Sequence, residues 1–212
     1  MKKFQNGFTL VEIAIVLLII GLLLGGVLKG QELIDSAKAK NLGQDLRSIP
    51  AMIHAYQDRF RALPGDDRAA TRHLCSAEEN CTAFGNGNGV IDGDWDATAD
   101  TETVRFWQHL RLANLMTGST DTDAPDFLPR NALGGRLGIQ RGNSVLGVPG
   151  SLVVCSDAIP GKLVRQLDIA LDDGDPARGS LRAGTSGEGG LVAISTSNPL
   201  VDANSHTVCA SL

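Results

Sequence analysis

The pattern of apolar and polar positions divides the first third of the chain into two parts. Residues 8–28 are almost uniformly apolar, and Glu12 is the one charge among them. Such a run is long enough to cross a bilayer as a helix. After Lys29 the apolar residues recur at spacings of three and four, which places them on one face of a helix. These positions are Leu42, Leu46, Ile49, Ile53, Tyr56 and Phe60.

The pattern therefore predicts one long helix over residues 8–62, with an amphipathic part over 29–62. Pro50 interrupts the apolar stripe, and we expect it to kink the helix or to restart it with Ser48 as a cap. The sequence Leu63-Pro64-Gly65-Asp66 is typical of a helix end. Residues 63–212 then form a globular head.

Short apolar runs in the head predict strands at 151–155, 191–195 and 207–212, and Leu181 belongs to another. Helical spacing of apolar residues predicts helices over 103–116 and 162–171. These elements together indicate an α+β fold, in which the long helix packs on a small antiparallel sheet accompanied by short helices. The order of the strands does not follow from the pattern.

The N-terminus fits neither of the two commonest uses of an apolar run. Residues 1–7 are polar and include Lys2 and Lys3. A secretory signal would have its cleavage site after the apolar region, but here that region continues into Lys29 and an amphipathic stretch. A plain membrane anchor would have no use for Glu12, because a charged side chain costs about 2.5–3.5 kcal/mol at the centre of a membrane helix. Glu12 is therefore expected to have a partner of opposite charge.

The residues Gly7-Phe8-Thr9-Leu10-Val11-Glu12 resemble the cleavage and methylation motif of type IV prepilins and of type II secretion pseudopilins. The resemblance implies that a prepilin peptidase removes residues 1–7 by cutting between Gly7 and Phe8, and then methylates the new amine of Phe8. It also implies a pilin-like fold. The ammonium group left on Phe8 would lie beside hydrocarbon, where Glu12 of a neighbouring subunit is a suitable counter-charge. The chain departs from many type IVa pilins in having no proline before Pro50.

This resemblance implies a structural subunit, a pilin or minor pilin of a type IV pilus. Its expected partners are other pilin subunits, the prepilin peptidase and an inner-membrane assembly platform. Before assembly a single span would hold it in the inner membrane with the head in the periplasm, and assembly would place it in an extracellular pilus. A pseudopilin of a type II secretion system, in a periplasmic pseudopilus, is the alternative, and the large head favours the pilin.

The sequence favours neither an enzyme nor a nucleic-acid-binding protein. The four histidines are scattered, and no nucleophile motif or phosphate-binding glycine loop is present. The net charge of −5 provides no basic field for nucleic acid. An enzyme or binding protein tethered in the periplasm by the apolar helix is the alternative from a different functional class.

All four cysteines lie in the part that would be exported, where disulfides can form. Four cysteines allow three pairings. We favour Cys75 with Cys81, which closes a small loop, and Cys155 with Cys209, which joins two predicted strands and tethers the C-terminus as the pilin disulfide does. Zinc is disfavoured, because the spacing lacks the C-x2-C pairs of a zinc ribbon.

An acidic loop between the second cysteine and the helix predicted at 103–116 carries oxygen side chains separated by glycines. These side chains belong to Asn86, Asn88, Asp92, Asp94 and Asp96. Calcium takes six to eight oxygen ligands, so the loop is a candidate calcium site, although its spacing does not fit an EF-hand. A turn without metal is the alternative. Residues 172–176, a second acidic stretch, are interpreted as a helix stop and tight turn, and no other cofactor is expected.

Overall fold

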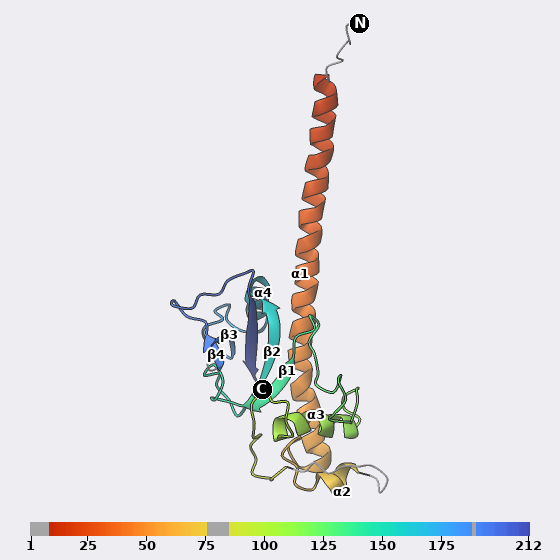
Figure 1. Ribbon diagram of the computed structural model, residues 1–212, viewed down its shortest axis with the longest axis vertical. Coiled ribbons are helices and arrows are strands. Elements are labelled where there is room, and N and C mark those ends of the chain that lie inside the picture. Colours follow the sequence, from red (N-terminus) through yellow and green to blue (C-terminus); the bar gives the residue numbers. More distant parts are fainter. Residues whose placement is uncertain (1–8, 76–84, 188–189) are drawn as a thin grey trace. The chain divides into compact units, whose positions relative to one another are not determined.

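The computed structural model describes residues 9–75, 85–187 and 190–212 (Figure 1). The chain divides into two compact units, residues 1–37 and 38–212, and the boundary falls inside helix α1 (Leu10–Phe60). The second unit contains the head and the part of α1 that packs with it. The described residues of the first unit belong almost entirely to helix α1, whereas the second unit has a buried core.

The amphipathic part of α1 buries the predicted stripe. Its buried apolar residues are Ala39, Leu42, Leu46, Ile49, Ile53 and Tyr56. The expectation of a restart at Pro50 is wrong, because the helix continues through it. Ser48 is no cap either, since its hydroxyl donates to the Asp45 carbonyl at 2.8 Å. Buried neighbours on both sides of Pro50 hold the helix in place and offset the lost backbone hydrogen bond.

The helix ends at Phe60, two residues before the predicted end, on a left-handed residue. Arg61 has a φ of 55°, and its N–H donates to the Gln57 carbonyl at 2.8 Å. A residue in this conformation after the last turn is a common helix terminator.

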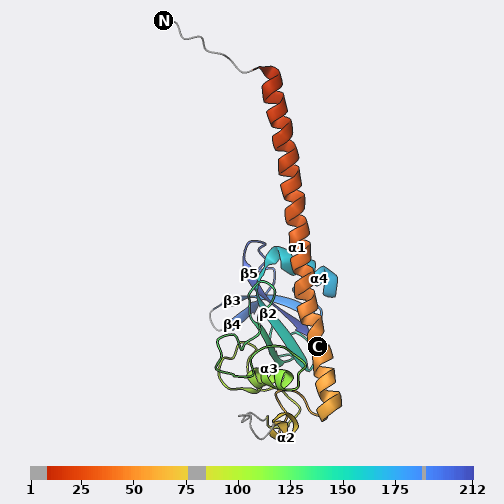
Figure 2. The same ribbon diagram turned by 90° about the vertical axis from the view of Figure 1, so that its right-hand side faces the viewer.

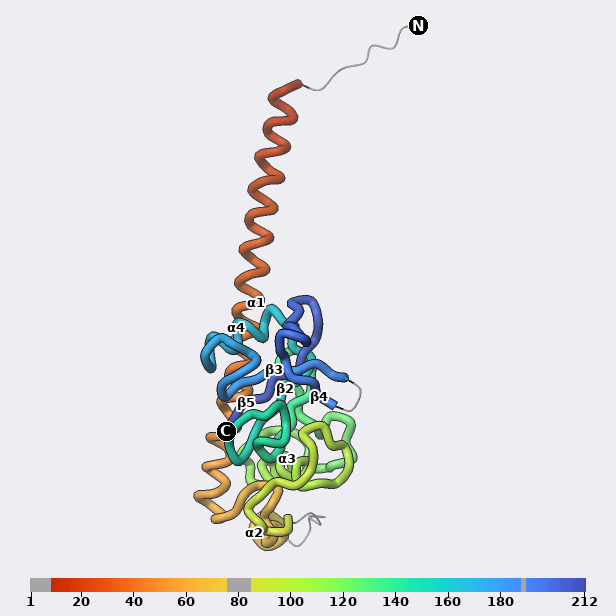
Figure 3. Tube along the Cα trace, turned by 90° about the vertical axis from the view of Figure 1, so that its left-hand side faces the viewer, coloured from red at the N-terminus to blue at the C-terminus, as the bar shows by residue number. Residues whose placement is uncertain are grey.

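Within its described residues, the head contains one antiparallel sheet of five strands, in the order β1-β2-β5-β3-β4. The strands are β1 (Leu137–Arg141), β2 (Leu152–Pro160), β3 (Leu181–Gly187), β4 (Gly190–Ala193) and β5 (Ser205–Ser211). The part of the head that the structure describes also contains helices α2 (Ala70–Leu74), α3 (Glu102–Leu112) and α4 (Gly161–Leu171). In Figures 2 and 3, α3 and α4 lie near opposite ends of the sheet. The predicted α+β, pilin-like architecture is confirmed.

The two faces of the sheet bury different side chains. One face shares a core with the α1 stripe and with Phe106 and Trp107 of α3. The other face carries a smaller cluster that contains Trp95, Val153 and the disulfide of Cys155 and Cys209. Successive residues of a strand point to opposite faces, so β2 contributes Val154 to the first core and its neighbours to the second. The head thus has two apolar layers on one sheet.

Strand β1 and helix α2 were not predicted from the sequence. The glycines around β1 hide its apolar alternation, and one of them is required by packing. A Cβ at Gly138 would overlap the Trp95 carbonyl, and the Trp95 N–H donates to Gln140 Oε1 at 2.9 Å. The acidic loop therefore crosses β1 at a position that only glycine permits.

Candidate functional site

The first unit exposes apolar side chains all round the helix. The large exposed side chains are those of Leu10, Val11, Ile13, Ile15, Val16, Leu17, Leu18, Ile19, Ile20, Leu22, Leu23, Leu24, Val27, Leu28, Leu33 and Ile34. Among the described residues, α1 is the one helix long and apolar enough to cross a membrane. A helix that is apolar on every side is stable only when lipid or other apolar helices surround it. This unit therefore requires a partner surface.

Glu12 lies at the start of this helix and has a local role that sequence reasoning missed. Its Oε2 accepts from the hydroxyl of Thr9 at 3.4 Å and from the Thr9 N–H at 3.5 Å. The Glu12 N–H donates in turn to the Thr9 hydroxyl at 3.3 Å. This reciprocal arrangement is a capping box, and T-x-x-E before an apolar run is its sequence signal. Glu12 therefore fixes the first turn of α1 in addition to any pairing between subunits.

The predicted cleavage site, Gly7 and Phe8, lies outside the described residues. Cleavage between them and methylation of Phe8 stay predictions from the sequence.

The acidic loop is held by two buried carboxylates that the sequence did not indicate. Asp66 Oδ1 accepts from the N–H groups of Gly87 and Asn88 at 2.6 and 3.1 Å, and Asp66 Oδ2 accepts from the Gly89 N–H at 2.6 Å. Gly87 and Gly89 have positive φ angles of 74° and 85°, which turn these N–H groups toward one point. The loop therefore wraps around a carboxylate some twenty positions earlier in the chain, a distance that sequence patterns do not bridge.

Glu102, at the start of α3, holds the other side of the same loop. Its Oε1 accepts from the Asn86 N–H at 2.8 Å and its Oε2 from the Asp92 N–H at 2.9 Å. Asp66 and Glu102 are buried, so the hydrogen bonds from backbone N–H groups replace those that each carboxylate would make to water. The backbone of the loop is thus organised by protein groups.

Three of the five predicted calcium ligands lie together, but donors already occupy their oxygens. Asn86 Oδ1 accepts from the Asn88 N–H at 2.9 Å, and Asn88 Oδ1 accepts from the Val90 N–H at 2.8 Å. Asp92 Oδ2 accepts from the side-chain amides of Asn86 and Asn88 at 2.9 and 3.4 Å. These are the bonds of an asparagine turn. The arrangement favours the turn without metal, and calcium in this loop stays a prediction.

The remaining two predicted ligands lie elsewhere. Asp94 and Asp96 line a cavity of about 580 Å³ together with Arg136. Arg136 Nη1 donates to the Asp96 carbonyl at 2.7 Å. A fixed guanidinium in that cavity would oppose a bound cation.

Within the described residues, one group of three acids converges in a way that could hold a metal ion. It consists of Asp168, Asp172 and Asp173, at the end of α4. Helix α4 ends at Leu171, so the predicted helix stop is present. The sequence interpretation gave this stretch only that role.

Cys155 and Cys209 form a disulfide, which is the pairing expected from the sequence. The two residues lie directly opposite each other on β2 and β5. Cys75 also belongs to a disulfide. Its expected partner, Cys81, lies outside the described residues, so that pairing stays a prediction.

A hydrogen-bonded group of Tyr56, Asp67 and His73 was also missed by sequence reasoning. Asp67 Oδ2 accepts from the Tyr56 hydroxyl at 2.9 Å and lies 2.7 Å from His73 Nδ1, and Asp67 Oδ1 accepts from the Ala69 N–H at 2.8 Å. Tyr56 and Asp67 are fully buried. The group ties the end of α1 to the segment that carries α2, which is a structural role.

We expect acid to weaken this tie. Burial acts to raise the pKa of Asp67, but the bonds from His73, Ala69 and Tyr56 outweigh it and lower the pKa below 3.8. A lowered carboxyl pKa contributes stability above the unfolded value, and that contribution is lost as the pH falls through the folded value. Urea unfolding of the full chain should therefore show Asp67→Asn destabilised by about 1–3 kcal/mol at pH 7, and by less at pH 3.

The exposed Asp58 on α1 supplies the control, since Asp58→Asn should change the unfolding free energy little at either pH. A difference between wild type and Asp67→Asn that is the same at both pH values would contradict the assignment.

Residues 2–28 match the family model of the prokaryotic N-terminal methylation motif. The matched range contains Gly7, Phe8 and Glu12, and the resemblance drawn from the sequence is confirmed. No curated protein and no solved structure matches the chain.

Proposed function

We propose that this chain, which carries the cleavage and methylation motif shared by type IV pilins and pseudopilins, is a pilin or minor pilin of a type IV pilus. The observation that carries the proposal is the matched motif at the start of a helix whose apolar surface is exposed on every side. Subunits with such a helix bury it in the inner membrane first and against one another afterwards. The head would stay outside the membrane throughout.

Assembly would use both parts of the N-terminal segment. Removal of residues 1–7 by a prepilin peptidase creates an ammonium group on Phe8. An inner-membrane assembly platform would then transfer the subunit into a growing fibre, where that ammonium meets Glu12 of a neighbour. Apolar side chains supply most of the contact between subunits, and the charge pair would set their relative height, because an unpaired charge in an apolar shaft is strongly unfavourable.

The pseudopilin of a type II secretion system is the second candidate, because it shares the same motif. A periplasmic enzyme or binding protein with a pilin-like anchor is the third, and it would be processed without entering a fibre. Fibres sheared from the cell surface separate the three. This chain should be present in them, whereas a pseudopilin would stay with the cell and its deletion would stop protein secretion.

We expect the mature protein to begin at Phe8 with a methylated amine. The intact mass of protein purified from membranes should lack residues 1–7 and carry one added methyl group. Gly7→Leu should leave the full precursor mass, because a side chain at the cut site does not fit a narrow peptidase cleft. A wild-type chain that still starts at Met1, or that is cut after the apolar run, would end the proposal.

A further inference from the structure

The carboxylate of Asp168 is buried, and no ion pair within the described residues replaces its contacts with water. The residue lies in the last turn of α4 and is 0% exposed. Neither Oδ1 nor Oδ2 accepts a hydrogen bond of normal length and angle, and the Gly174 N–H is the smallest of the influences on the group. A buried carboxylate without a well-formed hydrogen bond is strongly destabilising unless it takes up a proton or a cation.

The surroundings of Asp168 make its negative charge still less favourable. The carboxyl end of a helix carries a partial negative charge, and the last turn of α4 contains no basic residue. Burial first, and then the charges of Asp172, Asp173 and Asp175, raise the pKa of Asp168 to about 6, and the Gly174 N–H opposes this rise. The end of α4 is thus an acidic site in which no positive charge of the described chain pairs with the buried carboxylate of Asp168.

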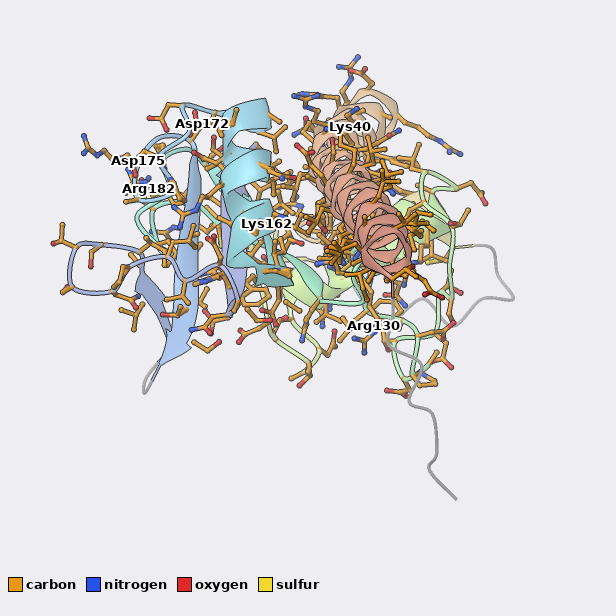
Figure 4. The ribbon with its side chains drawn as sticks, turned by 90° about the horizontal axis from the view of Figure 1, so that it is seen from above. Lys40, Arg130, Lys162, Asp172, Asp175 and Arg182 are labelled. Atoms are coloured by element: carbon orange, nitrogen blue, oxygen red, sulfur yellow. A yellow bond between two sulfur atoms is a disulfide. The ribbon has the colours of Figure 1, made fainter. Side chains whose placement is uncertain are left out.

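None of the nearby arginines that the structure describes forms an ion pair with Asp168. Arg178 Nε pairs with Asp175 at 3.0 Å, and Arg47 Nη2 donates to the Ala170 carbonyl at 3.0 Å. The positive charge of Arg182 attracts the carboxylate of Asp172, while its guanidinium donates hydrogen bonds to the carbonyls of Gly179 and Leu146. Figure 4 shows Asp172, Asp175 and Arg182 beside one end of α4, with Lys162 on its other half.

We propose that Asp168, Asp172 and Asp173 bind a calcium ion at the end of α4. One carboxylate oxygen from each residue lies within 4.8 Å of those of the others. Calcium accepts six to eight oxygen ligands in irregular geometry, whereas magnesium demands a near-ideal octahedron, so three carboxylates from one helix end and the turn after it suit calcium better. Asp173 is exposed, so water can complete the coordination. The ion would neutralise the buried carboxylate of Asp168.

The ion would also join two elements of the head. Asp172 Oδ2 accepts from the Leu181 N–H at 2.9 Å, and Asp172 Oδ1 accepts from the Ser180 hydroxyl at 3.0 Å. These bonds use one lone pair of each oxygen, and a carboxylate oxygen has a second. A cation held by Asp168 and Asp172 would therefore fasten α4 to the start of β3.

Calcium binding can be measured on the full chain in detergent micelles at pH 7.5. Isothermal titration with calcium chloride should show one ion per chain. At a hundredfold excess over Kd, the Tm should rise by about 5–10 °C relative to a chelator. Asp168→Asn should raise the Kd at least tenfold and remove the Tm shift. Asp173→Asn, on the exposed side of the site, should weaken binding without lowering the Tm in chelator.

Asp92→Asn in the acidic loop and Asp123→Asn in an exposed turn are the matched controls, and both should bind calcium like the wild type. Loss of binding in Asp92→Asn, with Asp168→Asn unchanged, would move the ion to the acidic loop and overturn the proposal. A wild-type chain that binds no calcium would overturn it as well. Equal stabilisation by magnesium chloride would contradict the choice of calcium.

Discussion

Glu12→Gln is expected to abolish incorporation of this subunit into a fibre while leaving its insertion into the membrane intact. The substitution removes the charge that would pair with the Phe8 ammonium of a neighbouring subunit. Truncating one partner of a buried ion pair costs about 3–5 kcal/mol, because the other charge is left uncompensated. That loss would recur at every subunit contact. Immunoblots of sheared fibres and of membranes, compared at equal expression, measure the two outcomes separately.

The capping box makes the choice of substitution important. Glutamine can replace glutamate in such a box, so Glu12→Gln removes the charge and keeps the local hydrogen bonds. Thr9→Val does the reverse, since it removes the hydroxyl that bonds to Glu12 and keeps the carboxylate. We expect Thr9→Val to assemble nearly normally. Equal loss of assembly in both variants would show that the helix start, rather than the charge, is what assembly requires.

The second large effect is expected at the disulfide of the head. Cys155→Ala combined with Cys209→Ala should lower the free energy of unfolding by about 4 kcal/mol, because the bond closes a loop across a sequence separation of 54. For a chain of this size that corresponds to a Tm lower by about 8–16 °C. Circular dichroism of the full chain in micelles measures it. A reducing agent should lower the Tm of the wild type toward that of the variant.

The other cysteine pair provides a matched control. The predicted Cys75–Cys81 bond would close a much shorter loop, so replacing both residues by alanine should cost about half as much. The prediction fails if the Cys155 and Cys209 variant melts like the wild type, since the packing of the sheet alone would then hold β2 and β5 together.

The elements that the sequence predicted well are those whose apolar residues repeat over several turns or fill a continuous run. The stripe from Leu42 to Tyr56 has a helical period over four turns, and β5 is a compact apolar run between polar residues. Strand β1 has neither property. Its residue 138 must be glycine because the acidic loop passes too close for a side chain, and this requirement does not come from the strand itself. The local preference of proline left open whether Pro50 kinks or restarts the predicted helix; the helix continues through it, with Ile49 and Ile53 buried on either side.

The site shows the same division between local and distant causes. The motif around Glu12 is contiguous, so it could be recognised, and its T-x-x-E box could have been read from the same residues. The acidic loop was selected for its own oxygens, but their partners Asp66 and Glu102 are far away in the chain. Asp168 could not be singled out, because its importance comes from burial and from neighbours beyond the end of α4. A sequence shows which polar groups are present, but it does not show which of them become buried on folding.

The position of β5 in the sheet has a consequence for the order of folding. It pairs with β2 on one side and β3 on the other, through residues 205–211. Until those residues have been synthesised, the growing chain exposes two unpaired strand edges, which are ready templates for association with other chains. Contacts between segments this far apart also close slowly. Completion of the head must therefore follow synthesis through residue 211, and the interval before it is the period in which this subunit most needs protection from aggregation.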